Sequence, residues 1–569
     1  MSQEPALSPV VRPAQIRVLT GPNLYFSRPA VAVTLDAGPA LVADAADFVG
    51  WQRALRVRRP AVGLPFSETR ALATAELAAA LVRRAAARIT TRLAAVARPG
   101  DDDTVIVAFP FRHRGTAEVF AEAVAEAFAA VTARGTTVGA ALAGIRPALA
   151  GHDPGETVTP LRPGIPVVAV TGTNGKTTTT RLIAHLIRAG GRVPGWSSTD
   201  GIVIDGVEVE TGDWSGPGGA ARVLADPTVQ VAVTETARGG ILLRGIGTAA
   251  NDVSVVTNIS ADHLGLLGVH TVEQLAEVKS VIVRITKPGG WTVLNADDPL
   301  VLGMRAVSRA RPWYYSTDPD NPHLDEALAA GGRATTVIDG VVVVLGHGLD
   351  PTPIIAVADV PLTLAGSSRV NVANVLAASA AALGLGVGKD AVRRGLATFA
   401  ADAAHNAGRL NVYELDGTAI VLDLAHNEAS LASLLEVADA LRLPGGELGV
   451  VVGTAGDRPD EALHAMGAMA AVAADHLLIA AQRKYLRGRE PGEMERLWRA
   501  GAAEAGVMDV PEADGETAAL VRLLDAGLPA GSVIAVCTLE SRAEMAAEIA
   551  RRGGSEAGPT EVAARVGGS

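Results

Sequence analysis

Short apolar runs alternate with helix-like segments along most of the chain after residue 166. The runs of the first series are mostly apolar and end in polar residues, as is typical of parallel strands covered on both faces. We expect these strands at residues 166–170, 229–234, 252–257 and 291–294. A second series begins near residue 407, with strands expected at 419–422, 448–452, 476–479 and 533–536. The pattern therefore predicts two successive α/β units, each built on a parallel sheet.

The first 155 residues follow a mixed pattern. Strand-like runs at 14–20, 31–35 and 104–109 accompany Ala-rich helical stretches at 69–96 and 115–133. Runs of both kinds predict a further α/β unit at the N-terminus.

Pro and Gly gather between residues 153 and 166, as they do in linkers. The sequence thus predicts an α/β protein of three domains. We expect an N-terminal α/β domain at 1–155, a central parallel-sheet domain with a phosphate-binding loop at 163–405, and a C-terminal α/β domain at 406–569.

The stretch 167–180, Val-Val-Ala-Val-Thr-Gly-Thr-Asn-Gly-Lys-Thr-Thr-Thr-Thr, joins a buried strand to a helix through a Gly-rich turn. Gly172 and Gly175 let backbone N–H groups converge on an anion, and the helix adds the positive end of its dipole. Lys176 supplies a positive charge for the β- and γ-phosphates, and Thr177 a hydroxyl for Mg²⁺. A plain Gly-rich turn with a surface lysine is the alternative interpretation.

Polar residues follow the other strands of this unit, where ligands of open parallel sheets bind. Glu235 comes directly after 229–234 and has the chemistry to bind a Mg²⁺ that bridges two phosphates; the alternative is an ordinary acid at a helix N-terminus. His263, beside Asp262, is a candidate second metal ligand or a structural histidine. Residues 295–298, Asn-Ala-Asp-Asp, are expected at the same edge if the strands are neighbours.

The last unit offers two weaker candidates. Asp423 follows the strand at 419–422 and is placed to bind a ribose, and Arg409, just after Gly408, to reach a phosphate from the domain boundary. Surface Asp and Arg residues after strands are common, so each is weak evidence alone.

Composition and charge narrow the class of protein. A net charge of 50 − 61 = −11 argues against nucleic acid or an anionic membrane as the main partner. The one cysteine, Cys537, lies in an apolar run and fits core packing in a reducing compartment. The N-terminus shows no secretory pattern. The uncharged stretch 370–388 contains Asn371 and Asn374, which favours a buried helix over a membrane span. We expect a cytoplasmic protein.

Taken together, these motifs resemble those of the Mur ligase family, whose members use ATP to join amines to carboxylates. The matching motifs, in the family's order, are Gly-Thr-Asn-Gly-Lys-Thr at 172–177, Asn258 with Asp262-His263, Asn371-Val372-Ala373-Asn374, Gly408-Arg409, and Asp423 with His426. Within the family the chain is most similar to the cyanophycin synthetases, through residues 17–23, 198–202, 215–217, 235–242, 258–265, 456–458 and 487–489. The ATP-grasp domain of those enzymes has no room here, since the first unit joins the Mur-like part across a short linker.

The resemblance implies a Mur-type central domain, a Rossmann-like C-terminal domain and a set of roles. ATP would be held by the loop residues Gly172, Thr173, Asn174, Gly175, Lys176, Thr177 and Thr178, with Asn371 and Asn374 at the adenine and Arg409 and Asp423 from the last domain. Thr177 and Glu235 would bind a first Mg²⁺. His263 and a carbamylated Lys279 would bind a second, although Lys279 can also be an ordinary helix lysine. Lys176, Glu235, His263 and Lys279 would form the catalytic set.

The activity implied is the ATP-dependent joining of an amino-acid amine to a carboxylate through an acyl phosphate. The alternatives are a non-catalytic Mur-like partner of a separate ATP-grasp peptide ligase, and a P-loop kinase or nucleotidase. Where cyanophycin synthetases carry acids, residues 480–485 read Ala-Ala-Gln-Arg-Lys-Tyr, which favours an acidic or neutral amino acid over arginine if that loop touches it. A homo-oligomer stays open.

Overall fold

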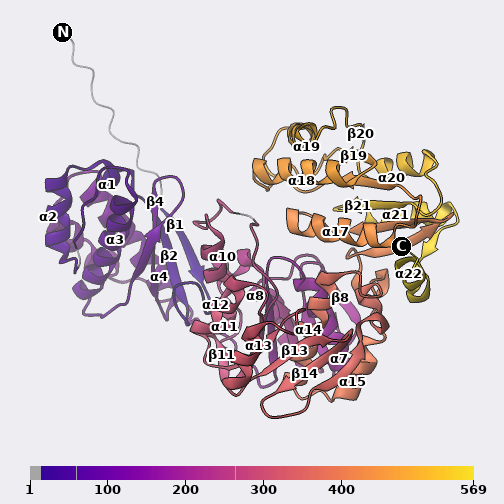
Figure 1. Ribbon diagram of the computed structural model, residues 1–569. Helices are drawn as coiled ribbons and strands as arrows, with labels where there is room; N and C mark the ends of the chain where they lie inside the picture. The colour runs from indigo at the N-terminus through magenta and orange to yellow at the C-terminus, as the bar shows by residue number, and fades with distance from the viewer. Residues whose placement is uncertain (1–13, 59, 263, 569) are drawn as a thin grey trace, which may run out of the picture.

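The computed structural model describes residues 14–58, 60–262 and 264–568, whose strands form three sheets. We call the parts built on these sheets the N-terminal, central and C-terminal units. In Figure 1 the N-terminal unit (indigo) lies on one side of the central unit and the C-terminal unit (orange to yellow) on another. The predicted α/β fold class is confirmed.

The N-terminal unit is an antiparallel sheet of order β1-β2-β4-β3 packed against helices. Its strands are β1 (Gln15–Leu19), β2 (Ala30–Asp36), β3 (Val96–Pro99) and β4 (Thr104–Pro110). Its helices are α1 (Gly38–Val42), α2 (Ala45–Leu55), α3 (Glu68–Arg88), α4 (Arg114–Thr132), α5 (Val138–Ala143) and α6 (Ile145–Ala148).

One prediction for this unit is wrong in its extent. The helix expected through residue 96 ends at Arg88, and 96–99 form the edge strand β3. Thr90 adopts a left-handed backbone with φ 57°, a conformation that ends a helix. The Ala-rich composition continues past this point and conceals the boundary.

The central unit has an eleven-stranded sheet of order β15-β14-β13-β12-β11-β10-β5-β9-β6-β7-β8. Its strands are β5 (Val167–Thr171), β6 (Pro194–Ser197), β7 (Gly201–Ile204), β8 (Val207–Thr211), β9 (Val231–Glu235), β10 (Asn251–Val256), β11 (Thr286–Asn295), β12 (Arg311–Tyr315), β13 (Arg333–Ile338), β14 (Val341–Gly346) and β15 (Thr352–Ala356). The strands from β6 to β13 in this order run parallel, and antiparallel hairpins extend both edges. The predicted strands β5, β9, β10 and β11 are confirmed, whereas the edge hairpins escaped prediction.

Helices cover both faces of this sheet, which is why its inner strands β5 and β9 are mostly apolar. They are α7 (Lys176–Ala189), α8 (Pro217–Leu224), α9 (Arg238–Arg244), α10 (Val272–Lys279), α11 (Val281–Arg284), α12 (Pro299–Gly303), α13 (Pro322–Ala329), α14 (Arg369–Gly384), α15 (Lys389–Leu396) and α16 (Ala403–Asn406). Val168 and Val170 of β5 pack with α7 and α14, whereas Ala169 packs with α9, α10 and α11 on the opposite face. The expected buried helix after residue 370 is α14, and none of the helices in the described ranges is long and apolar enough to cross a membrane.

The C-terminal unit has a sheet of order β20-β19-β18-β21-β17-β16-β22, parallel from β20 to β17. Its strands are β16 (Asn411–Leu415), β17 (Thr418–Asp423), β18 (Leu448–Val452), β19 (His476–Ala480), β20 (Glu512–Ala513), β21 (Val533–Cys537) and β22 (Ser555–Glu556). Its helices are α17 (Glu428–Leu441), α18 (Asp460–Ala473), α19 (Glu493–Glu504), α20 (Glu516–Asp525), α21 (Arg542–Arg551) and α22 (Pro559–Val566). The four strands predicted here are confirmed, and Cys537 is buried as expected.

The boundaries proposed at 155, 163 and 405 stay predictions. The segment between the first two units bonds to both of them: Glu156 O accepts from Arg114 N at 2.9 Å, and Leu161 N donates to Gly247 O at 3.2 Å. Because the segment bonds to both units, the structure gives no single residue as the boundary between them.

Candidate active site

The phosphate loop joins β5 to α7 and depends on two glycines. Gly175 has φ +81°, and a Cβ there would lie 2.4 Å from Asn374 Oδ1. At Gly172 a Cβ would lie 1.8 Å from Thr257 Oγ1. Both positions exclude a side chain because the loop packs directly on β10 and α14.

The residues just after β10 hold the loop in shape. Asn258 accepts from Thr173 N at 2.8 Å with its carbonyl and from Asn174 N at 2.9 Å with its side-chain oxygen. Its amide nitrogen donates to Asn174 O at 3.1 Å, and Thr257 Oγ1 donates to the same oxygen at 2.6 Å. Asn258 therefore orders the loop backbone that would face an anion.

Glu235 lies against the start of α7. Thr177 Oγ1 donates to Glu235 Oε2 at 2.8 Å, and Glu235 Oε1 has no hydrogen-bond partner in the described part of the chain. The side chain is 2% exposed, and burial raises its pKa, against the lowering effect of Lys176. A buried carboxylate oxygen without a partner, beside a hydroxyl, is a donor set that suits a hard divalent cation.

Lys279 reaches the same place from α10. It is buried, and its Nζ donates to Gly172 O in the phosphate loop. Burial first, and the nearby Lys176 second, lower the pKa of Lys279 well below its ordinary value. Lys176 itself donates to Thr173 O at 2.7 Å. His263, the other predicted ligand of a second metal, lies outside the described residues.

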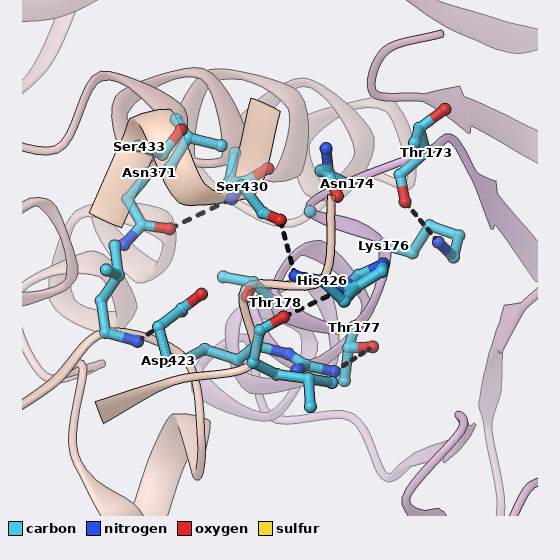
Figure 2. A pocket seen from close by; sticks show the side chains of 16 residues that line it. Thr173, Asn174, Lys176, Thr177, Thr178, Asn371, Asp423, His426, Ser430 and Ser433 are labelled. Atoms are coloured by element: carbon cyan, nitrogen blue, oxygen red, sulfur yellow. Dashed lines mark hydrogen bonds between the residues drawn. The ribbon is translucent and has the colours of Figure 1, made fainter. Parts of the chain in front are cut away.

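The predicted nucleotide-binding residues line one pocket between the central and C-terminal units, and Gly172 is the exception (Figure 2). The lining is Thr173, Asn174, Gly175, Lys176, Thr177, Thr178, Val370, Asn371, Asn374, Arg409, Leu410, Asp423, Leu424, His426, Ser430 and Ser433. Of these, Ser430 and Ser433 escaped sequence reasoning. The signal available for them was Asn427, which caps α17 and so places the first turn of that helix at the pocket.

Asn371 and Asn374 form a chain of side-chain hydrogen bonds on α14. Thr179 Oγ1 donates to Asn374 Oδ1 at 3.1 Å, Asn374 Nδ2 to Asn371 Oδ1 at 3.1 Å, and Asn371 Nδ2 to Leu362 O at 3.0 Å. The chain ties α14 to α7 beside the phosphate loop.

The C-terminal unit contributes a cation and a carboxylate. Arg409 Nη2 lies 3.5 Å from Thr177 Oγ1. Asp423 Oδ2 accepts from Leu410 N at 2.9 Å, and burial raises the pKa of Asp423 to about 6, although Arg409 opposes the shift. Asn174 and Asn427 exchange amide hydrogen bonds of 3.2 and 3.1 Å across the two units. The two units are therefore closed on each other in this conformation.

Two acids expected at this edge, Asp297 and Asp298, bond to neighbouring loops. The strands are neighbours, as predicted, but Asp298 caps α12 by accepting from Leu300 N and also accepts from Ile259 N. Asp297 accepts from Thr317 N at 3.0 Å. Residues 295–298 therefore lie at the expected edge, but neither aspartate lines the pocket, because groups of adjacent loops occupy both carboxylates; Asp297 also accepts from Asn321 Nδ2 at 3.0 Å. Across the described ranges no three His, Cys, Asp or Glu residues form a metal-binding group.

The loop with the unexpected basic residues lies away from the pocket. Arg483 pairs with Asp514 at 3.2 Å and Lys484 with Glu540 at 2.9 Å, both on the surface. Contact of this loop with an amino acid stays a prediction.

Comparison with known families agrees with this architecture. The model of the Mur ligase middle domain matches residues 170–382, and that of the Mur ligase glutamate ligase domain matches residues 408–538. The chain belongs to the Mur ligase family.

Curated relatives include cyanophycin synthetases. The chain is 41% identical over 368 residues to that of Synechocystis sp., covering 63% of this chain and 41% of the relative. It is 42% identical over 329 residues to that of Crocosphaera subtropica, covering 58% and 37%. The chain thus spans about two fifths of the length of these relatives. A UDP-N-acetylmuramyl-tripeptide synthetase of Deinococcus radiodurans is 30% identical over 350 residues, covering 60% and 65%.

Among solved structures, E. coli FolC in complex with ADP is similar at 19% identity over 69% of this chain and 91% of that chain. The TM-score of this match is 0.49.

Proposed function

We propose that this protein is an ATP-dependent ligase that joins the amine of an amino acid to a carboxylate through an acyl phosphate, releasing ADP and phosphate. The observation that carries the proposal is one pocket that combines the phosphate loop, the buried Thr177–Glu235 pair, and Arg409 and Asp423 from the opposite unit. A nucleotidase would not need the C-terminal unit. A ligase does need it, because a unit that covers the pocket keeps water away from a reactive intermediate.

ATP is the nucleotide in this proposal. The backbone N–H groups of the loop and the Lys176 ammonium group would hold the phosphates. Both lie at the N-terminus of α7, which is a favourable place for an anion. Asn371 and Asn374 lie where an adenine would reach α14, and the buried Asp423 carboxylate would accept from ribose hydroxyls.

Mg²⁺ fits the residues present. Thr177 and Glu235 would hold one ion, since the Thr177 hydroxyl bonds to one oxygen of the Glu235 carboxylate and the other oxygen has no partner in the described part of the chain. His263 and a carbamylated Lys279 would hold a second. The depressed pKa of Lys279 supports this part, because only the neutral amine adds CO₂. The cations would offset negative charge as the γ-phosphoryl group moves.

The proposed reaction has two steps, and residues of this chain assist each of them. The substrate carboxylate attacks the γ-phosphorus and ADP leaves; the amine then attacks the acyl carbon and phosphate leaves. Lys176 and Arg409 would stabilise the charge of the transferring group. Closure of the C-terminal unit, by contacts such as Asn174–Asn427, would exclude the water that hydrolyses an acyl phosphate.

The substrates are proposed by class only: an amino acid, acidic or neutral if residues 480–485 touch it, and a small or peptidic carboxylate acceptor. A separate ATP-grasp enzyme can act beside this one. The alternative role, a non-catalytic partner of such an enzyme, would tolerate loss of Lys176 or Glu235, and both are present in a bonded arrangement.

The test is the release of ADP and phosphate with panels of amino acids and carboxylate acceptors. Amine-dependent turnover supports the ligase, whereas a phosphorylated product without amine contradicts it, and no turnover favours the partner role. Lys176→Ala should abolish ATP turnover with the fold intact by circular dichroism. Lys287→Ala is the control, since Lys287 is an exposed lysine that pairs with Asp252. Unchanged turnover in Lys176→Ala would refute the site.

A further inference from the structure

The N-terminal unit contacts the central unit at two places. The segment between β1 and β2 bonds to the end of α9, where Thr20 N donates to Arg244 O and Pro22 O accepts from Ile246 N, and a hairpin contacts the segment around α10. This hairpin consists of β3, β4 and the turn between them, and it lies next to α10. Figure 1 shows the unit on that side of the molecule, near α10 and α12. Nothing in the proposed mechanism so far uses it.

Asp101, in the hairpin turn, holds the segment before α10. Both of its carboxylate oxygens accept from Gly268 N, at 3.1 and 3.0 Å, and Oδ1 lies 2.8 Å from His270 Nε2. Gly268 is buried, so without Asp101 its N–H would lose its partner and the turn would be less stable. The fit is close, since a Cβ on Gly268 would lie 3.3 Å from Ile106 Cδ1 in β4.

Arg98, on β3, holds the other end of the same helix. Its Nη2 donates to both oxygens of Glu277, at 3.0 and 3.1 Å, and its guanidinium lies 5.4 Å from the centre of the Tyr25 ring. The Arg98 side chain is only 20% exposed. Glu277 is 51% exposed, so solvent screens the ion pair, and the position of Arg98 beside Tyr25 adds to the contact.

The helix between these two contacts, α10, ends beside the phosphate loop. α10 has eight residues, too few to be stable in isolation. Its last residue, Lys279, donates to Gly172 O, and Glu277 precedes it by two positions. The contacts thus run without a break from the N-terminal hairpin, through turn 264–270 and α10, to the phosphate loop.

We propose that the β3–β4 hairpin is a positioning element of the active site, which acts through Asp101 and Arg98 to hold α10, and with it Lys279, against the phosphate loop. The inference rests on the proposed function for its catalytic readout, but the mobility of α10 tests it independently. It gives the N-terminal unit a role in the chemistry of the central unit.

The experiment uses the full chain with matched substitutions. Asp101→Asn removes the negative charge of the turn and leaves one oxygen in place of the two that accept from Gly268 N. Asp103→Asn, two residues away at an exposed position, is its control, since the Asp103 side chain makes none of the contacts described. Arg98→Glu opposes Glu277, and the double variant Arg98→Glu/Glu277→Arg restores an ion pair in reverse.

Amide hydrogen exchange of residues 264–279 is the first readout. We expect faster exchange in Asp101→Asn and Arg98→Glu, wild-type exchange in Asp103→Asn, and recovery in the double variant. The second readout is turnover against Mg²⁺ and ATP. Losing a group that orients a metal-binding residue costs about tenfold in metal affinity or activity, so the Mg²⁺ needed for half-maximal rate should rise about tenfold, with little change in the KM for ATP.

Each result decides the matter. Unchanged exchange in Asp101→Asn and Arg98→Glu overturns the proposal, and so does faster exchange with unchanged kcat and Mg²⁺ requirement, since the hairpin would then only dock the unit. If the wild type shows no turnover, the proposed function fails. Binding of a fluorescent ATP analogue, titrated with Mg²⁺, then replaces turnover: a weaker Mg²⁺ response in Asp101→Asn supports positioning, and an unchanged response overturns it.

Discussion

Glu235 is buried, and one of its oxygens has no hydrogen-bond partner among the described residues. Glu495 shares these two features but bonds to Gln482 N within the C-terminal unit, whereas Glu235 bonds to Thr177 at the phosphate loop. Burial raises its pKa, so ionised Glu235 lowers the stability of the folded chain at neutral pH. A residue kept at such a cost is typical of a functional site.

Glu235→Gln should therefore separate stability from activity. We expect the free energy of unfolding at pH 7.5 to rise, because the buried charge is gone, and ATP turnover to fall about 100-fold or more, because the proposed metal loses its carboxylate. Urea unfolding and ADP release measure the two effects. Glu208→Gln, at an exposed position on β8, should change neither. A fully active Glu235→Gln variant would remove this residue from the site.

Asp423 makes a prediction about pH. Its folded-state pKa of about 6 lies above the ordinary value of 3.8, so the native state binds its proton more tightly than the unfolded chain. The stability linked to this proton is fully present below pH 3.8 and is lost as pH rises to about 6. Across this pH range the free energy of unfolding linked to the Asp423 proton falls by about 3 kcal/mol.

We expect Asp423→Asn to be more stable than the wild type at pH 7.5 by about 1–3 kcal/mol, and to bind nucleotide more weakly. In the wild type, nucleotide affinity should rise as pH increases through about 6, because the ionised carboxylate is the better acceptor for a ribose hydroxyl. Titrations of a fluorescent ATP analogue between pH 5 and 8 measure this. A variant that keeps the wild-type pH profile would show that another group is responsible.

At the scale of elements, the connection from β5 to α7 depends on close backbone approach. Gly175→Ala should combine a strained left-handed backbone with a clash against Asn374, at a cost of about 1–3 kcal/mol, and displace the loop that would hold phosphate. Nucleotide affinity should fall more than tenfold, as measured by titration of the fluorescent analogue. Gly139→Ala, in α5 with nothing near its Cβ, should be neutral or stabilising. Equal effects of the two substitutions would mean that the loop is not the binding element.

The same elements show what sequence reasoning can reach. Lys176, Thr177 and Glu235 were predictable because each follows a buried apolar run, and parallel strands bring their carboxyl ends to one edge. Asp297 and Asp298 obey the same rule, yet they cap a helix and a loop. Whether a carboxylate meets a ligand or a backbone N–H depends on loops whose paths the local pattern does not encode.

Contacts between distant segments were beyond the sequence for a related reason. Asp101 and Gly268 are 167 residues apart, and hydropathy says nothing about which turn a hairpin meets. The hairpin strands β7 and β8 were also missed. β8 is mostly exposed and lacks the apolar run that indicates a buried strand, and β7 is apolar and buried but has four residues, too short a run to stand out.

At the scale of the whole molecule, one ion pair joins the central and C-terminal units next to the site. Arg458 Nη1 lies 3.0 Å from Asp262 Oδ1, with side chains 7% and 13% exposed. Arg458 Nε also donates to His426 O at 2.9 Å. Removing one partner from such a buried pair costs about 3 kcal/mol, because the remaining charge stays desolvated. This cost falls on the closed arrangement, since separation of the units would return Asp262 to water.

Arg458→Ala should therefore shift the protein toward an open form about 100-fold without unfolding it. An open site admits water, so a larger share of the acyl phosphate should hydrolyse before the amine attacks. The measurement is the ratio of ADP released to amide formed, which should rise above that of the wild type while overall amide formation falls. Arg442→Ala is the matched control, because Arg442 pairs with Asp439 and Asp475 on the surface of the same unit. If Arg458→Ala kept the wild-type ratio with a reduced rate, the ion pair would contribute to the rate alone, and exclusion of water would have to come from other contacts between the units, such as Asn174–Asn427 and Arg409–Thr177.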